Sequence, residues 1–214
     1  ANYDSLLAGW GARTVQPDLL ISFDELQYSL LGEFGRQKLV DAGWTIKDGG
    51  LILGIRPFIT TWRTTSANEE VTIPTGSGDD VEDFSFQISW GDGSVESFNG
   101  VDDPNLSHTY TEAGDYKIKI LSPTAGFRLL PTQDGDLDQL ISLDQWGDIQ
   151  WKSMNRAFAW ARNMEYKATD TPDLSAVSDV AAMFFAAEKL NGDFSEWNTS
   201  TITDMSFMFD GATV

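Results

Sequence analysis

The segment Trp197-Asn-Thr-Ser-Thr-Ile202-Thr-Asp-Met205-Ser-Phe-Met208-Phe209 decides the fold, because two earlier segments resemble it. The earlier copies run over 146–158 and 172–184. The equivalent apolar positions, which lie 26 and then 25 residues apart, are Met154, Val180 and Met205. A period of this length is typical of a solenoid, in which each unit buries its apolar face against its neighbours. Such proteins usually present a surface and rarely act on small molecules.

The composition limits the classes of partner. The chain has 214 residues, enough for one large domain or two small ones, and 41% of them are apolar. There are 33 Asp and Glu residues against 14 Lys and Arg, which gives a net charge of −19. Phosphates attract clustered Lys and Arg, so this balance argues against nucleic acid and anionic lipid surfaces. The acidity fits three explanations: solubility of a highly exposed protein, calcium binding, or salty surroundings.

The chain has no cysteine, which excludes disulfides, thiolate metal sites and cysteine nucleophiles. No apolar run approaches the roughly 18 to 20 residues that cross a bilayer, and no signal peptide is visible. Membrane insertion is therefore not expected. The sequence begins at Ala1 and not at Met, as in a processed protein or an excised fragment.

Residues 1–50 are predicted to form a small α/β unit. One helix face recurs at i, i+3, i+4 and i+7. Its residues are Tyr3, Leu6, Leu7 and Trp10. An alternating strand is expected over 19–23, a second helix over 31–42 with Gly43 at its C′ position, and a short strand over 44–46.

Residues 51–130 change to the period of two that is typical of strands. The clearest alternating apolar run is Phe84, Phe86, Ile88 and Trp90. A later run has Ile118 and Ile120 on one face and Lys117 and Lys119 on the other. Several short strands separated by Gly, Asp and Pro clusters predict a β-sandwich.

The segment Ser89-Trp90-Gly91-Asp92-Gly93, followed by His108-Thr109-Tyr110 and Tyr116-Lys-Ile-Lys-Ile120, resembles a PKD domain over about residues 56–128. The resemblance implies an immunoglobulin-type sandwich of extracellular proteins, used as a spacer or an interaction module. The glycines permit the positive φ of a tight turn, and Asp92 can accept bonds from neighbouring N–H groups. Tyr110 and Tyr116 are expected to pack inward, with their hydroxyls bound to loop backbone.

The repeat signature is an apolar residue, Thr/Ser-Asp-Met/Val, two variable residues and Met-Phe. With Phe194-Ser-Glu-Trp197 before it, the last copy resembles the repeats of BspA-like leucine-rich-repeat surface proteins of bacteria, over about residues 140–214. The resemblance implies a right-handed solenoid of strands and helices. The expected core positions are Trp197, Ile202, Met205, Met208 and Phe209. The first unit departs from the signature at Lys152-Ser153 and Ala157-Phe158, and we interpret it as a transition unit.

Residues 1–50 resemble the segment that closes such repeat arrays, although here that segment comes first. A parent protein with this unit in tandem would explain the order, because the closing segment of one unit would then cover the repeats of the unit before it. The repeats are followed by no polar cap in this sequence, which leaves an apolar face open. The residues expected at this assembly interface are Tyr3, Leu6, Trp10, Met205, Met208 and Phe209.

Catalytic signals are weak. The single histidine, His108, lies inside the sandwich signature, so a structural role is expected for it and not a place in a nucleophile–His–acid triad. Trp146, Trp151 and Trp197 occupy repeat core positions. Trp62 and Trp160 are the tryptophans expected to be exposed, as a carbohydrate platform would require.

Calcium is a candidate ligand at acidic clusters, although each cluster also fits a solvated loop. The segment Asp134-Gly-Asp136-Leu-Asp138 alternates carboxylates as a calcium loop does, but it lacks the glutamate that completes an EF-hand. The other clusters are Asp79, Asp80, Glu82 and Asp83, and Asp102 and Asp103.

The predicted fold is mixed β and α/β: an α/β closing segment (1–50), a PKD-like β-sandwich (51–130) and leucine-rich-repeat-like solenoid units (131–214). We expect a non-enzymatic extracellular or cell-surface protein of a bacterium that assembles with itself, head to tail, into an array or filament. No cofactor is expected apart from the calcium candidate. The alternatives are an adhesin module that binds a glycan or a protein, an accessory module of a carbohydrate-active enzyme, and a calcium-dependent spacer.

Overall fold

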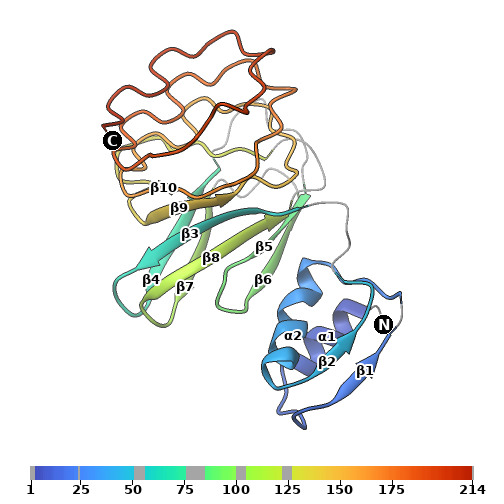
Figure 1. Cartoon of the computed structure of the whole chain (residues 1–214). Helices are drawn as coiled ribbons and strands as arrows, with labels where there is room; N and C mark the ends of the chain where they lie inside the picture. Colours follow the sequence, from blue (N-terminus) through green and yellow to red (C-terminus); the bar gives the residue numbers. More distant parts are fainter. Residues whose placement is uncertain are drawn as a thin grey trace.

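The computed structural model describes residues 3–23, 25–50, 56–75, 85–99, 105–121 and 127–213. Three parts follow one another in space: a small α/β module, a group of β-strands and a stack of coils (Figure 1). The N-terminal module and the C-terminal coil lie at opposite ends of the molecule. The described part is therefore rich in β-structure, with two helices, both in the N-terminal module.

The N-terminal module has the predicted order of elements. They are α1 (Tyr3–Gly11), β1 (Leu20–Ser22), α2 (Leu30–Asp41) and β2 (Thr45–Lys47). β1 and β2 pair in parallel, and Gly43 follows α2 with φ of +89°, as a C′ glycine does. A Cβ on Gly35 would lie 2.3 Å from the carbonyl oxygen of Leu7, so the close crossing of the two helices needs glycine at that position.

The module has a hydrophobic core of its own. Its buried members are Leu7, Tyr28, Leu39 and Trp44. One ion pair joins the module to the strands that follow, between Lys119 Nζ and Glu33 Oε1 at 2.8 Å. We infer that the module folds around its own core and is held beside the sheet through few contacts.

The strands form a large sheet and a separate pair. They are β3 (Phe58–Thr64), β4 (Glu69–Pro74), β5 (Ser85–Ser89), β6 (Val95–Asn99), β7 (Asn105–Tyr110) and β8 (Gly114–Leu121). β4 pairs with β7, and the six-stranded sheet has the order β10-β9-β3-β8-β5-β6. Residues of both sheets share one core, among them Val71 and Ile73 of β4 and Ile118 and Ile120 of β8. Of the predicted alternating runs, Phe86 and Ile88 lie on β5 and Ile118 and Ile120 lie on β8, whereas Trp90 directly follows β5 and Phe84 lies outside the described residues.

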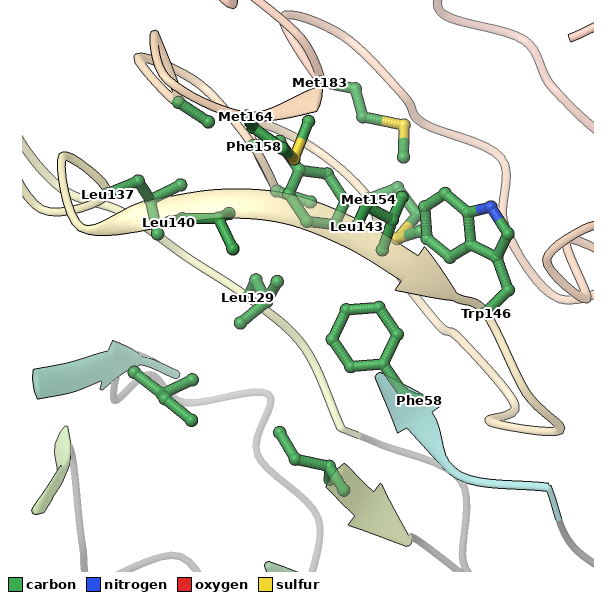
Figure 2. Packing of buried hydrophobic residues seen from close by; sticks show 14 of the residues in the cluster. Phe58, Leu129, Leu137, Leu140, Leu143, Trp146, Met154, Phe158, Met164 and Met183 are labelled. Carbon is green, nitrogen blue, oxygen red and sulfur yellow. The ribbon is translucent and has the colours of Figure 1, made fainter. Parts of the chain in front are cut away.

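The large sheet continues across the predicted boundary at residues 130 and 131. β9 (Leu140–Gln145) pairs antiparallel with β3, and β10 (Glu165–Tyr166) pairs in parallel with β9. Leu129, Leu137 and Leu143 pack between this sheet and the coils (Figure 2). The first coil is thus joined to the β-strands through hydrogen bonds and through a shared core. No periodic pattern in the sequence predicts this connection.

The coils consist of turns and not of the helices implied by the repeat resemblance. Residues 146–213 contain no helix, and β10 is their only named strand. Left-handed φ values recur at equivalent places in successive coils, at Arg156, Ala182 and Phe207 and again at Trp160, Ala186 and Gly211. A right-handed helix cannot continue through a residue with positive φ, so each coil bends instead of winding into a helix.

Candidate functional site

The backbone of each coil divides its N–H groups between two uses. Alternate N–H groups close tight turns inside the coil, as Ala157 N donates to Met154 O at 3.1 Å and Ala159 N donates to Arg156 O at 3.0 Å. The N–H groups between them donate to the next coil. The N–H groups of residues 154–161 and 180–187 therefore all have partners although the segment is neither helix nor sheet.

The first set of cross-coil bonds runs from residues 154–160 to residues 179–185. Its members are Met154 N to Asp179 O, Arg156 N to Ala181 O, Phe158 N to Met183 O and Trp160 N to Phe185 O, at 3.3, 3.0, 2.8 and 2.7 Å. The second set repeats the pattern one coil further on. Its members are Val180 N to Asp204 O, Ala182 N to Ser206 O, Phe184 N to Met208 O and Ala186 N to Asp210 O, at 2.9, 2.8, 2.9 and 2.8 Å. Through these two sets the second coil accepts from the first and donates to the third, while Thr203 N and Asp204 N of the third coil donate to Ser178 O of the second at 2.7 and 3.2 Å.

The aspartate of the repeat signature holds the turn that opens the second and third ladder segments. Asp179 Oδ1 accepts from Ala181 N and Asp204 Oδ1 accepts from Ser206 N, both at 2.8 Å. The N–H of Ser206 and its hydroxyl keep the pKa of Asp204 below its ordinary value. Asn155 Nδ2 also donates to Asp179 Oδ2 at 2.8 Å, which ties the first coil to the second. A turn-forming Asp explains the signature without any ligand.

A column of phenylalanine rings runs through the coils. Phe158 stacks on Phe184 with ring centroids 5.6 Å apart, and Phe184 stacks on Phe209 at 5.7 Å, both with planes 14° apart. Trp146, Trp151 and Trp197 are buried near this column, as predicted. The column therefore links the cores of the three coils.

The last described coil leaves its outer side open. Met205, Phe207 and Phe209 are 45%, 69% and 44% exposed, whereas Met208 is buried. Met205 and Phe209 are predicted core residues, but nearly half of each side chain is exposed, because no described coil covers it. The N–H groups of Met205, Phe207, Phe209 and Gly211 continue the ladder positions but meet no acceptor among the described residues.

The predicted N-terminal partners of this face lie mostly inside their own module. The Tyr3 ring is 4.8 Å from that of Phe23, and the Trp10 ring is 5.8 Å from that of Trp44. Leu6 is half-buried. Their role in an interface therefore stays a prediction, and only part of each side chain is open. The large exposed apolar side chains of the module are Leu19, Leu20, Leu26 and Val40, which the sequence analysis did not single out.

A buried ion pair supports the core of that module. The Asp48 carboxylate accepts from Arg36 Nε at 2.8 Å and from Tyr3 Oη at 2.7 Å. Burial alone would raise the pKa of Asp48, but these two donors hold it below its ordinary value. Burial and the bond to Asp48 raise the pKa of Tyr3. Tyr3 is thus fixed by a hydrogen bond at the surface of its own fold.

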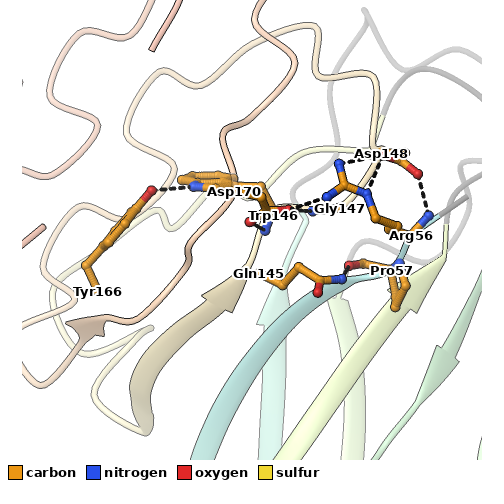
Figure 3. A network of polar contacts seen from close by, with 8 residues as sticks. All are labelled: Arg56, Pro57, Gln145, Trp146, Gly147, Asp148, Tyr166 and Asp170. Carbon is orange, nitrogen blue, oxygen red and sulfur yellow. Dashed lines mark hydrogen bonds and ion pairs between the residues drawn. The ribbon is translucent and has the colours of Figure 1, made fainter. Parts of the chain in front are cut away.

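A polar network fixes the first coil against the sheet (Figure 3). Asp170 accepts from Trp146 N at 2.9 Å and from Gly147 N at 3.0 Å, and Arg56 Nη1 lies 3.4 Å from it. Arg56 also pairs with Asp148 at 2.9 Å. Gly147 has φ of +67°, and a Cβ there would lie 2.4 Å from the carbonyl oxygens of Arg56 and Pro57. These contacts join the first repeat unit, which departs from the repeat signature, to the strands.

The carboxylates considered for calcium are engaged elsewhere or lie outside the described residues. Asp134 forms a short ion pair with Arg162, and Asp136 Oδ2 accepts from Thr132 N at 2.8 Å. Asp138 joins neither of them in a cluster. In the part of the chain that the structure describes, no group of three carboxylates or histidines is arranged to hold a metal ion. The candidates outside that part are Asp79, Asp80, Glu82, Asp83, Asp102 and Asp103.

His108 lies on β7 and contacts the turn of the sandwich signature. Its ring stacks on Trp90 at 4.9 Å, and its Nε2 lies 2.8 Å from Asp92 and 3.4 Å from Ser94 Oγ. A catalytic triad needs the acid and the nucleophile on different ring nitrogens, whereas both contacts here use Nε2. Asp92 also accepts from Ser94 N at 2.9 Å, as predicted for this turn.

The aromatic residues around this turn pack as expected, with one exception. Tyr110 Oη donates to Trp90 O and Tyr116 Oη donates to Glu112 O, both at 2.7 Å, so both hydroxyls bind loop backbone. Trp160 is partly exposed. The prediction that Trp62 is exposed is wrong. It is 1% exposed, because it lies on the same face of β3 as Phe58, and its Nε1 donates to Thr60 Oγ1.

A polar groove lies where the strands meet the coils. A cavity of about 400 Å³ is lined on both sides by charged residues, among them Arg63, Glu69, Glu165, Lys167 and Lys189. Arg63 pairs with Asp115, and Lys167 pairs with Glu165 at 3.1 Å. Among the residues that the structure describes, no aromatic ring lines this cavity, so this lining offers no stacking platform for a sugar.

Comparison with known proteins places only the C-terminal third of the chain. Residues 142–214 match a family described as a Mycoplasma protein of unknown function, DUF285. The match loosely fits the BspA-like repeats expected for the same stretch. No curated protein and no solved structure matches the chain. Neither helix in the described part of the chain has the length and apolar character that a membrane crossing requires.

Proposed function

We propose that this chain is a non-enzymatic structural unit of a bacterial surface protein, and that such units join head to tail into an extended array outside the cell. The ladder of hydrogen bonds between coils carries the proposal. Two sets of cross-coil bonds join three coils, and the third coil has Phe207 69% exposed and Met205 and Phe209 45% and 44% exposed. Apolar side chains exposed on a repeat unit are sites of association with a further unit.

The three parts of the chain take distinct roles in the proposal. The coils at 131–214 are BspA-like repeat units, and the strands of 51–130 act as a PKD-like spacer. The module at 1–50 closes the repeats of a neighbouring unit. Its position supports this division, because the module lies at the other end of the molecule from residues 190–213 and does not cover its own last coil (Figure 1).

The mechanism is geometric. Burying the open apolar side chains against a neighbour stabilises the joint by about 25 cal/mol for each Å² of apolar surface removed from water. A net charge of −19 keeps the exposed sides of neighbouring arrays apart, so association is limited to the ends. The positions of His108, Asp92 and Ser94 around one ring nitrogen also favour a structural role for the only histidine.

Sedimentation velocity over a wide concentration range, with negative-stain electron microscopy of the same samples, tests the proposal. We expect the average mass to rise with concentration, and we expect linear particles with an axial repeat of one unit. A protein that stays monomeric at the highest concentration and appears as isolated globules would contradict it. Added salt should weaken the association little, because its main component is apolar burial.

A second candidate is an adhesin module that binds a glycan or a protein. The charged groove between strands and coils favours it, because groups of both signs line a cavity of about 400 Å³. A glycan array and a surface-protein pull-down test this candidate. Saturable binding that disappears in Lys167→Glu and remains in Phe207→Asp would place the ligand in the groove, and the absence of saturable binding would reject the candidate.

A further inference from the structure

The groove between the strands and the coils is longer than one cavity. The charged cavity of about 400 Å³ adjoins a second cavity of about 360 Å³, because Glu165 and Lys189 line both. Tyr166 and Asn191 complete the described lining of the second cavity. Each volume is in the range of sites that bind small molecules. We call the two adjoining cavities the junction groove.

Cations and carboxylates alternate along the junction groove. Arg63 Nε and Nη2 donate to the two carboxylate oxygens of Asp115 at 2.6 and 2.7 Å, and Lys167 Nζ lies 3.1 Å from Glu165. The two pairs also act on each other. Asp115 raises the pKa of Arg63 most and Glu165 adds to the effect, while Arg63 lowers the pKa of Asp115 most and Lys167 adds to that effect. The lining therefore offers donors and acceptors side by side.

Hydrogen bonds within the lining fix its polar side chains. Asn163 Nδ2 donates to Asp138 O at 3.0 Å, and Asn163 Oδ1 accepts from Lys189 Nζ at 3.1 Å. Gln139 Nε2 donates to Glu69 Oε1 at 2.9 Å. An ammonium group has three N–H donors, so Lys189 keeps donors for a ligand after its bond to Asn163. Side chains that are already ordered lose less entropy when a ligand binds.

The chemistry of the lining favours a ligand that is neutral and polar. Each cation of the groove already has a carboxylate or an amide as its partner, so a charged ligand would have to displace one. The net charge of −19 also repels anions. Among the described residues of the first cavity, Ile141 is the only aliphatic one, so apolar peptide side chains have little to pack against. A hydroxyl donates and accepts at once, so it can bond to both members of a pair without separating them.

Tyr166 gives the second cavity an aromatic ring that the described lining of the first does not have. Its Oη accepts from Nε1 of the buried Trp146 at 2.8 Å, so the hydroxyl points into the core (Figure 3). A Cβ on Gly192 would lie 2.7 Å from Cγ of Tyr166, so glycine is needed where this backbone crosses the ring. The ring is thus held in a fixed position at the cavity, where the C–H groups of a sugar can pack against it.

We propose that the junction groove binds a neutral oligosaccharide, whose hydroxyls bond to the alternating cations and carboxylates and one of whose rings packs against Tyr166. This inference rests on the second candidate function, to which it adds the class of ligand, and it does not depend on assembly. Hydrogen bonds to charged groups are the stronger ones and set the orientation of the sugar. The groove is polar and open to water, so we expect a Kd of about 1 mM.

Saturation-transfer NMR titrations with defined tetrasaccharides test the class of ligand. The probes are neutral tetrasaccharides of glucose, galactose and N-acetylglucosamine, with tetragalacturonate as the charged counterpart of the galactose probe. We expect saturable binding of at least one neutral probe, and we expect its Kd to change less than about twofold between about 0.05 and 0.5 M NaCl, because the ligand carries no charge. Binding of tetragalacturonate alone, a Kd that rises steeply with salt, or no binding at about 10 mM of every neutral probe would overturn the inference.

A pair of lysine variants tests the location of the site. Lys189→Met keeps the aliphatic stem and removes the ammonium donors, and we expect it to weaken binding of the neutral probe about tenfold. Lys47→Met, at an exposed lysine of the N-terminal module, is the matched control and should bind as the parent does. Circular dichroism checks that both variants fold. Unchanged affinity in Lys189→Met would place the ligand elsewhere and overturn the inference.

The outcome for the groove is separate from the outcome for assembly. If no neutral probe binds while sedimentation shows assembly, this inference fails and the proposed array stands. If a neutral probe binds as expected while the protein stays monomeric, the array fails and the junction groove stands as a sugar site.

Discussion

The rings of Phe184 and Phe209 stack on each other with their centroids 5.7 Å apart, yet Phe184 is completely buried and Phe209 is 44% exposed. The difference arises because Phe184 lies between two rings of the column and Phe209 covers only one. The same side chain in the same local conformation thus contributes differently to stability at the two positions.

Alanine substitutions of these two rings should separate the contributions. We expect Phe184→Ala to lower the free energy of unfolding by about 3 to 5 kcal/mol, the usual cost of removing a buried Phe. Phe209→Ala should cost less than half of that in dilute, monomeric protein. Urea denaturation followed by tryptophan fluorescence measures both. Equal losses would mean that the last coil is covered in solution.

Two glycines with positive φ differ only in their surroundings. A Cβ on Gly147 would lie 2.4 Å from backbone oxygens, whereas one on Gly50, at φ of +78°, would have nothing within 4 Å. Gly50→Ala should therefore cost about 1 to 2 kcal/mol, the price of the left-handed conformation alone. Gly147→Ala should cost about 3 kcal/mol or more. Thermal unfolding compares the two, and similar melting temperatures would contradict the close contact between the first coil and β3.

Removing the Asp170 carboxylate should loosen the first coil. Asp170→Ala leaves Trp146 N and Gly147 N without their acceptor, and we expect a loss of about 2 to 4 kcal/mol. Asp115→Ala is the control, because Asp115 forms an exposed ion pair with Arg63. That variant should unfold at nearly the same urea concentration as the parent. If Asp115→Ala lowered the free energy of unfolding as much as Asp170→Ala, the network around Asp170 would stabilise the protein no more than an exposed ion pair does.

The N-terminal module should lose stability in acid through Asp48. Its pKa in the folded state is below the ordinary value of 3.8, so its bonds to Arg36 and Tyr3 contribute fully above pH 3.8. That contribution is lost as the pH falls through the lower folded-state pKa. Unfolding of the module can be followed by the fluorescence of Trp10 and Trp44 between pH 7 and pH 2.

The Asp48→Asn variant isolates this effect from the other carboxylates. It should be less stable than the parent at pH 7, and the difference between the two should shrink below about pH 4. A difference that stays constant down to pH 2 would show that the charge of Asp48 does not contribute to stability.

The elements that the sequence predicted well are those with a regular period. Tyr3, Leu7 and Trp10 repeat at helical spacing and lie on α1, and Ile118 and Ile120 alternate and lie on β8. Side chains facing one core impose these periods, so they can be found without a structure. The burial of Trp62 could have been predicted in the same way, because Phe58, Thr60 and Trp62 are alternate residues on one buried face of β3.

The coils could not be predicted at the same level, because their conformation depends on contacts between units. Arg156, Trp160 and Ala182 have left-handed φ values although none of them is a glycine, so the sequence does not indicate this conformation. They persist because the N–H groups of each coil find carbonyls on the next, which a single unit cannot provide. The pairing of β9 with β3 joins residues about 80 positions apart along the sequence, and no local pattern indicates it. The repeats predict the period of the coils but not the hydrogen bonds between them.

Amide hydrogen exchange at Met205, Phe207, Phe209 and Gly211 tests most directly whether units associate through the last coil. Val180, Ala182, Phe184 and Ala186 hold the equivalent positions one coil earlier and serve as an internal reference, because their N–H groups are bonded in every state. In dilute protein we expect the four outer amides to exchange rapidly and the four reference amides slowly. At concentrations where the protein is assembled, the outer amides should become protected as well. Assembly that leaves them exchanging as fast as in the monomer would contradict association through the last described coil.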